Sequence, residues 1–141
     1  MKILVIGANG QLGKDVTNEL LGRNIETITS DVVGDCNYLL DFAKLEDVMS
    51  LVKKELPDAI INCAAWTAVD MAEDDDKVEL VRKVNAGGTQ NIADACKIIG
   101  CKMLYLSTDY VFDGQGTEPW KPDCKEYKPL NVYGKTKLEG E

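Results

Sequence analysis

The chain has 141 residues, of which 45% are hydrophobic and 28% charged, as is ordinary for one soluble globular domain. Its 24 acidic and 16 basic residues give a net charge of -8, which repels phosphate backbones and anionic lipids and argues against nucleic-acid and membrane partners. The chain has no histidine, which excludes Ser-His-Asp hydrolysis, Cys-His proteolysis and histidine-ligated metals.

Two kinds of apolar pattern alternate along the chain. Short continuous runs predict buried strands at residues 2–6, 25–29 (closed by Ser30 and Asp31), 37–41, 59–64 and 102–107. Longer stretches with helical spacing predict helices over residues 11–21, 45–56 and 76–99, ended by Gly22, Pro57 and Gly100. This alternation requires a parallel sheet with right-handed crossovers, so we expect residues 1–141 to form one doubly wound α/β domain of Rossmann type.

A glycine-rich segment lies between the first predicted strand and the first predicted helix. Gly7, Gly10 and Gly13 follow a Gly-x-x-Gly-x-x-Gly spacing, in which Asn9 stands where the dinucleotide fingerprint has its second glycine. At this place backbone N–H groups and the positive helix end can hold a diphosphate, with Gln11 and Leu12 opening the helix. We therefore predict a dinucleotide site here; the alternative is that the glycines only terminate elements.

Asp31 ends the second predicted strand, 18 residues beyond Gly13. A carboxylate in this position accepts hydrogen bonds from the adenosine ribose and opposes a 2′-phosphate. No Arg or Lys occurs between Ile25 and Phe42 to bind such a phosphate. The segment thus favours NAD(H), with NADP(H) possible, and the alternative is a turn aspartate that caps the strand.

Candidate catalytic residues flank an expected surface loop, residues 113–129, that glycines and prolines interrupt. Beyond it, Tyr133 and Lys137 lie four residues apart, on one face of a helix that Pro129 and Asn131 introduce. Thr108 follows the strand predicted at residues 102–107. Such a trio can reduce a ketone, with Thr108 binding the carbonyl oxygen, Tyr133 giving the proton and Lys137 stabilising the phenolate. The alternatives are an ordinary exposed helix face and a threonine bonded to its own turn.

Other polar groups favour structural roles. The acids at residues 73–76 complement a helix N-terminus, and the five cysteines, odd in number and without Cys-x-x-Cys, indicate free thiols and no metal site. A reducing compartment and an amino-terminal run that enters a glycine turn favour a cytoplasmic protein. Asn85, beside Gly87 and Gly88, either supports the active site or belongs to a closely packed helix.

Several motifs together resemble the extended short-chain dehydrogenase/reductase family, over the whole chain. They are residues 6–13, 61–70, 84–85, 107–114 and 129–141, and the last two resemble the branch that reduces dTDP-4-dehydro-L-rhamnose. The resemblance implies NAD(P)H-dependent reduction of the 4-keto group of this nucleotide sugar to dTDP-L-rhamnose. It also implies that Thr108, Tyr133 and Lys137 are catalytic. Other implied contacts are Asp41 and Phe42 with adenine, Ala64 and Ala65 with the cofactor, and Thr67 and Tyr110 with nicotinamide or substrate.

The chain departs from the family in length, because members continue into a carboxyl-terminal substrate domain whereas this sequence stops at Glu141, inside the Lys137 helix. We therefore expect an incomplete dinucleotide-binding domain, inactive or nearly so alone, with an open sheet edge that favours self-association or a homo-oligomer. Two alternatives remain open. One is another sugar-nucleotide epimerase or dehydratase of the same fold, and the other is a non-catalytic NAD(P)-binding regulatory subunit.

Overall fold

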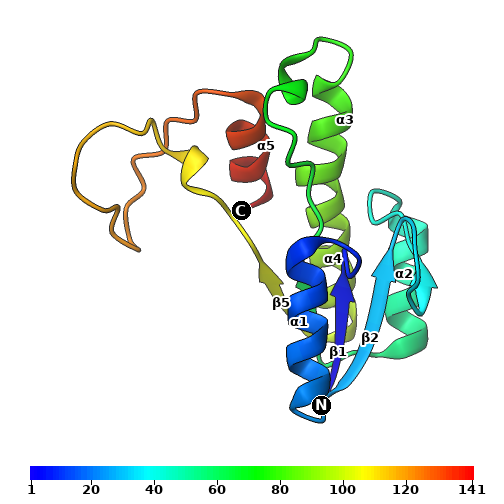
Figure 1. Cartoon of the computed structure of the whole chain (residues 1–141). Coiled ribbons are helices and arrows are strands. Elements are labelled where there is room, and N and C mark those ends of the chain that lie inside the picture. Colours follow the sequence, from blue (N-terminus) through cyan, green and yellow to red (C-terminus); the bar gives the residue numbers. More distant parts are fainter.

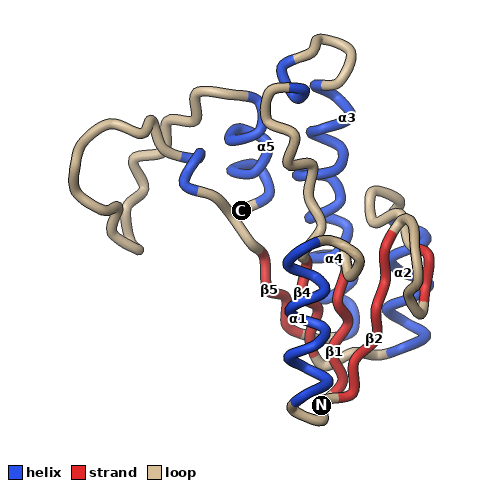
Figure 2. Tube along the Cα trace, in the orientation of Figure 1, coloured by secondary structure: helices blue, strands red, loops and turns tan.

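The computed structural model describes residues 1–141 and contains one five-stranded parallel sheet (Figures 1 and 2). The strands are ordered β3-β2-β1-β4-β5. Their bounds are β1 Lys2–Ile6, β2 Glu26–Asp31, β3 Tyr38–Leu39, β4 Ala59–Asn62 and β5 Lys102–Tyr105. β1 pairs in parallel with both β2 and β4. The strands before β4 are added on one side of β1 and the later strands on the other, so the carboxyl end of β1 is a topological switch point. Ligands of doubly wound folds bind at such a switch point.

Helices cover both faces of the sheet. The helix α1 (Gln11–Gly22) lies on one face, and α2 (Leu45–Glu55) and α4 (Thr89–Ile99) pack together on the other (Figure 1). The larger core of twelve buried residues lies under α2 and α4, and a smaller core of four lies under α1. The expected doubly wound α/β architecture is confirmed.

The long helix predicted over residues 76–99 is divided. It consists of α3 (Val78–Arg82), a π-helical segment at Lys83–Gly88 and α4, and Gly100 ends it with a φ of 75° as expected. Gly88 lies against Phe42, since a Cβ at this glycine would stand 2.4 Å from the Phe42 ring. The glycine therefore allows this helix to approach the β3–α2 connection. None of the helices in the structure is long and apolar enough to cross a membrane.

Two predicted element ends need adjustment. The first helix ends at Gly22, but Gly22 is its last helical residue, and the left-handed conformation (φ 56°) falls at Asn24 beyond it. Ser30 and Asp31 belong to β2 rather than closing it, because their backbones pair with Tyr38 and Leu39 of β3. At the end of α2, Leu56 with a φ of 48° makes the left-handed turn that precedes Pro57.

The carboxyl-terminal part stands beside the sheet rather than on it. After β5 and a short 3₁₀ turn at Asp109–Val111, residues 112–131 form an irregular arm that projects from the body (Figure 2). The arm returns to α5 (Val132–Gly140), which lies beside α3 (Figure 1). The predicted loop and the helix bearing Tyr133 and Lys137 are both present, and Asn131 caps the helix by accepting a bond from the Gly134 N–H at 2.7 Å.

Candidate functional site

The glycine-rich turn leaves no room for side chains at two of its glycines. Gly7 has a φ of 80°, and a Cβ there would lie 2.7 Å from the Ala64 nitrogen at the end of the neighbouring strand. A Cβ on Gly13 would lie 2.0 Å from the Gly7 carbonyl oxygen, so α1 packs directly on the turn. Gly10, the N-cap of α1, has no capping side chain, and no acidic residue occupies the first turn. The first N–H groups of α1 are therefore free to bind an anion.

A pocket of about 760 Å³ opens at this turn. It brings together most of the residues singled out in the sequence: Gly7, Gly10, Gln11, Leu12, Asp31, Asp41, Phe42, Ala64, Ala65, Thr67, Tyr133 and Lys137. Gly13, Thr108 and Tyr110 do not line it. The pocket thus joins the switch point of the sheet to the helix α5, which are separated by more than a hundred residues in the chain.

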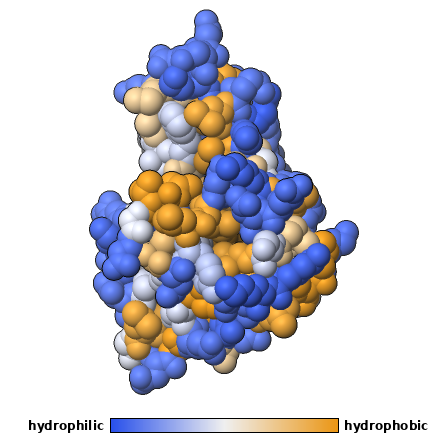
Figure 3. Space-filling view, turned by 90° about the vertical axis from the view of Figure 1, so that its right-hand side faces the viewer, coloured by the Kyte–Doolittle hydropathy of each residue, from blue (hydrophilic) through white to orange (hydrophobic).

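Asp31 lies at the β2 end of this pocket. Its two carboxylate oxygens accept backbone bonds from the Asn9 N–H at 2.8 Å and the Val32 N–H at 2.7 Å. Both the turn and the loop after β2 therefore orient the carboxylate before any ligand is present. The face of the molecule in Figure 3 carries a hydrophobic patch around its middle, with hydrophilic residues beside it. Val32 and Val33, both more than half exposed, line the same end of the pocket.

Lys137 is the only charged side chain among the buried residues, with 3% of its surface exposed. Its ammonium donates to the Leu106 carbonyl oxygen at 2.6 Å and lies 4.2 Å from the centre of the Tyr105 ring. Burial lowers the pKa of Lys137 to about 8, partly opposed by the Glu141 carboxylate. Tyr105, whose pKa burial raises to about 12, keeps its proton and donates to the Lys137 carbonyl oxygen at 2.9 Å.

Asn85 joins three segments around the pocket. Its side chain accepts from the Trp66 N–H at 2.8 Å and donates to the Trp66 carbonyl and to the Thr136 hydroxyl, at 3.2 and 3.1 Å. Thr136 stands between Tyr133 and Lys137 on α5 and donates in turn to the Tyr133 carbonyl oxygen. Asn85 is 2% exposed, so this network is shielded from water. It holds the strand-end segment of Trp66 against α5, which agrees with the supporting role considered for Asn85.

The two remaining candidates lie next to the pocket. The Thr108 hydroxyl accepts from the Tyr110 N–H at 3.2 Å and donates to Asp109 at 3.3 Å, so it caps the 3₁₀ turn that follows. The alternative of a threonine bonded to its own turn therefore describes its conformation here. Tyr110 contacts Tyr133 edge to face, with ring centroids 5.7 Å apart. Tyr110 therefore borders Tyr133 from the side of the arm.

Sequence reasoning missed several lining residues. They are Ile6, Asn9, Asp15, Val32, Val33, Leu40, Cys63, Trp66, Val84, Leu106 and Ser107. Cys63 and Leu106 directly follow β4 and β5, so their position after a parallel strand could have indicated them. Trp66 carried no such signal, because its place depends on the bonds from Asn85. No group of three or more His, Cys, Asp or Glu side chains is arranged to hold a metal ion.

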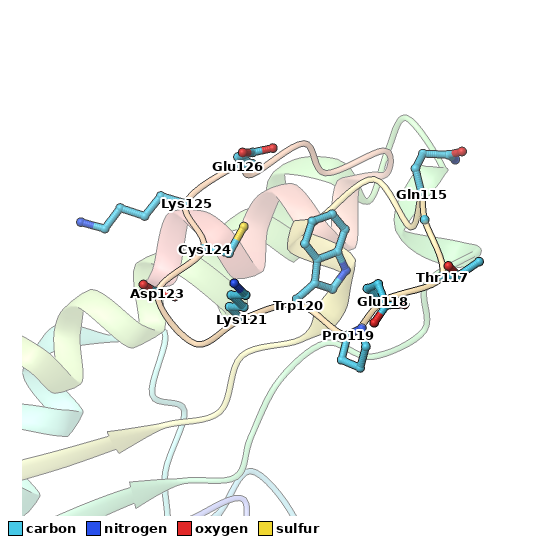
Figure 4. A pocket seen from close by; sticks show the side chains of 11 residues that line it. Gln115, Thr117, Glu118, Pro119, Trp120, Lys121, Asp123, Cys124, Lys125 and Glu126 are labelled. Carbon is cyan, nitrogen blue, oxygen red and sulfur yellow. The ribbon is translucent and has the colours of Figure 1, made fainter.

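A second hollow, of about 540 Å³, lies within the arm (Figure 4). All of its lining residues come from residues 115–126, and the Trp120 ring stands inside the curve while Lys125 points away. Phe112 stacks on Trp120 and on Tyr127, with centroids 4.4 and 5.6 Å apart. A single segment of the chain forms this hollow, whereas the pocket at the glycine turn brings together residues from distant parts of the sequence.

The sheet order and the uncapped, glycine-lined start of α1 define a doubly wound, Rossmann-like α/β protein. Residues 1–141 match the family described as RmlD substrate binding domain, and the chain belongs to this family. The dTDP-4-dehydrorhamnose reductase of Streptomyces griseus is 41% identical over 138 residues, 98% of this chain and 43% of that protein.

Solved structures agree with this assignment. A dTDP-4-dehydrorhamnose reductase from Clostridium acetobutylicum matches with a TM-score of 0.90 at 44% identity, over 99% of this chain and 47% of its own. The enzyme of the same name from Bacillus anthracis, solved in complex with NADP, matches with a TM-score of 0.89 at 37% identity, over 99% of this chain and 47% of its own. The chain thus spans about half the length of the relatives it matches.

Proposed function

We propose that the chain is the cofactor-binding and proton-donating part of an NAD(P)H-dependent reductase that converts dTDP-4-dehydro-L-rhamnose to dTDP-L-rhamnose. The observation that carries this proposal is the single pocket that unites the glycine turn with Tyr133 and Lys137. The names of the relatives from Streptomyces griseus and Clostridium acetobutylicum support the reaction and its nucleotide-sugar substrate.

The residues of the turn fit a dinucleotide. The uncapped N–H groups of α1 and the Cβ-free backbone at Gly7 and Gly10 suit a diphosphate, and Asp31 suits the adenosine ribose. Asp41 and Phe42 would border the adenine, and Ala64 and Ala65 the nicotinamide half, since all four line the pocket. A bound nicotinamide supplies the hydride that a ketone reduction needs.

The residues proposed to transfer the proton lie on α5. Tyr133 lines the pocket and would donate its phenolic proton to the carbonyl oxygen of the substrate. Lys137, four residues on, holds its ammonium at the same wall and would stabilise the phenolate that forms. The Thr108 hydroxyl would turn from Asp109 toward the substrate carbonyl, while Thr67 and Tyr110 would contact the sugar.

We propose that the chain prefers NADH to NADPH, although the Bacillus anthracis relative was solved with NADP. The support comes from this chain's own residues: Asp31 lines the ribose end of the pocket, and no Lys or Arg occurs between Ile25 and Phe42. Titrating the chain with each cofactor, followed by the cofactor's fluorescence, tests the preference. Asp31→Ala should narrow the difference, and equal binding of both cofactors by both proteins would contradict it.

The reduction itself is tested with a matched pair of proteins. In one, residues 1–141 replace the matching segment of the Streptomyces griseus relative, and the other carries Tyr133→Phe in addition. We expect both to bind NADH, but only the first to form dTDP-L-rhamnose, because a phenyl ring has no proton to donate. Equal product formation by the protein with the Tyr133→Phe substitution would refute the role of the tyrosine, and formation of an epimerised or dehydrated product would favour another enzyme of this fold.

We further propose that the chain self-associates through its sheet edge in the cytoplasm. β5 is one of the two edge strands, so the backbone groups on its outer side have no partner strand and can bind another one, and Leu104 within it is 53% exposed. The five free thiols support a reducing location. Sedimentation over a concentration series should show mass increasing with concentration, and a constant monomer mass would contradict the proposal.

A further inference from the structure

Asn9 extends from the glycine turn to the loop that follows β2. Its side-chain amide donates to the Val33 carbonyl oxygen at 2.6 Å, and its backbone N–H donates to Asp31 at 2.8 Å. These two bonds join a residue of the diphosphate turn to both ends of the segment 31–33. One residue therefore fixes the turn and the ribose end of the pocket relative to each other.

Gly34 completes this arrangement. It has a φ of 88°, and a Cβ on it would lie 2.7 Å from the Asn9 side-chain nitrogen. The loop thus bends closely around the Asn9 amide, and only glycine fits both the bend and the space. The contact is specific to the residue pair, because any side chain at position 34 would displace the amide of Asn9.

The same arrangement occupies the donors that a phosphate would need. The Asn9 and Val32 N–H groups both point at Asp31, whose carboxylate takes one bond on each oxygen. A 2′-phosphate on the adenosine ribose would have to compete with this carboxylate for the same two N–H groups, and no nearby cation in residues 25–42 would help it. A ribose hydroxyl meets no such competition, because it donates to the remaining lone pairs of Asp31.

We propose that Asn9 is a positioning residue that sets dinucleotide specificity: by holding Val33 and Asp31 it keeps the loop closed against a 2′-phosphate. The inference rests on the proposed function, in that the pocket must bind a nicotinamide dinucleotide. The ligand class it selects is a dinucleotide with a free 2′-hydroxyl. Because the loop is held in place beforehand, NADH binding does not have to order it.

The test compares dissociation constants of the purified chain for NADH and NADPH by fluorescence titration. Removing the side-chain bond with Asn9→Ala should weaken NADH binding about 3- to 10-fold, the usual effect of one hydrogen bond, and leave NADPH binding unchanged or tighter. The preference for NADH should fall by the same factor. Gly34→Ala should act alike by displacing the amide, and the Asn9→Ala/Gly34→Ala double variant should lose no more preference than Gly34→Ala alone.

Asn37→Ala is the matched control. Asn37 anchors the other end of the same loop, where its side-chain oxygen accepts from the Thr29 N–H at 2.9 Å and from the Thr29 hydroxyl at 3.0 Å, without contacting the turn. This variant should keep the wild-type preference. An equal loss of preference in Asn37→Ala would overturn the inference, because loosening of the loop alone would then explain the effect. Asn9→Ser replaces Asn9→Ala if circular dichroism shows that the alanine variant is unfolded.

The failure of the inference and that of the proposed function are distinguishable. Wild-type protein that binds neither dinucleotide would refute the proposed function. Wild-type protein that binds both equally would refute the preference for NADH, and with it the role of Asn9, but not dinucleotide binding. An Asn9→Ala variant with the wild-type preference would refute only the role of Asn9. A reduced preference in Asn9→Ala and Gly34→Ala, but not in Asn37→Ala, is the result that supports it.

Discussion

Replacing Lys137 with methionine removes the one charge that the fold buries. The ammonium is 3% exposed, and burial lowers the pKa of Lys137 from 10.5 to about 8 because a low-dielectric surrounding disfavours the charged form. Methionine has a similar length and no titratable group. We therefore expect the substitution to change how the free energy of unfolding depends on pH.

The sign of the change follows from proton linkage. The folded protein releases the Lys137 proton near pH 8 and the unfolded chain only near 10.5, so between these values the unfolded state binds more protons. Stability from this group is thus fully present above the unfolded pKa and is lost as the pH falls through the folded one. Between about pH 7 and about pH 9.5 the wild type should gain about 2 kcal/mol relative to Lys137→Met.

Urea unfolding followed by circular dichroism, with the cysteines kept reduced, measures this difference at each pH. The lost bond to Leu106 adds an offset that is nearly the same at every pH, so only the slope of the difference is interpreted. Lys135→Met, on the exposed face of the same helix, should follow the wild-type profile. Parallel profiles for wild type and Lys137→Met would show that Lys137 is not buried as described.

Three further substitutions test the packing of the site. Gly13→Ala places a methyl group about 2.0 Å from the Gly7 carbonyl and should weaken NADH binding by more than about tenfold in a fluorescence titration, whereas Gly87→Ala, with nothing within 4 Å, should leave binding unchanged. Asn85→Ala removes a buried amide and leaves the partly buried Trp66 N–H without its partner, so it should lower the urea unfolding free energy by about 1–3 kcal/mol; a loss near zero would mean that this network contributes nothing. Arg82→Ala breaks exposed pairs with Glu79 and Glu139 and should cost less than about 1 kcal/mol in the same measurement, decreasing with added salt.

The sheet and the glycine turn could be predicted because their signals are local. Continuous apolar runs such as Lys2–Ile6 have only one efficient way to be buried, as inner strands, and the flanking glycines mark where they end. Asp31 and the pair Tyr133 and Lys137 were found for the same reason, since each stands at a fixed offset from such an element. The pocket then unites them through strand order alone.

The remaining features could not be read from the apolar pattern alone. The π-helical segment at Lys83–Gly88 contacts the Phe42 ring through Gly88 and Trp66 through Asn85. A helical period in the sequence reveals neither contact. Thr108 lies outside the pocket lining, and its hydroxyl bonds the Tyr110 N–H and Asp109, which is the local alternative that the sequence also offered. The first helix ends at Gly22 as predicted, but the left-handed residue beyond it is Asn24, since asparagine also tolerates this conformation.

The helix α5 is attached mainly through polar groups, and its buried residues are Gly134, Thr136 and Lys137 rather than an apolar stripe. Glu73 bonds its first turn, Arg82 pairs with its last and Asn85 bonds its middle. The glycine turn, by contrast, rests on the apolar interior of the sheet. The two walls of the pocket should therefore respond to different additives: salt should weaken the exposed Arg82–Glu139 pair that helps to hold α5, while denaturants that solvate hydrocarbon are needed to open the glycine turn.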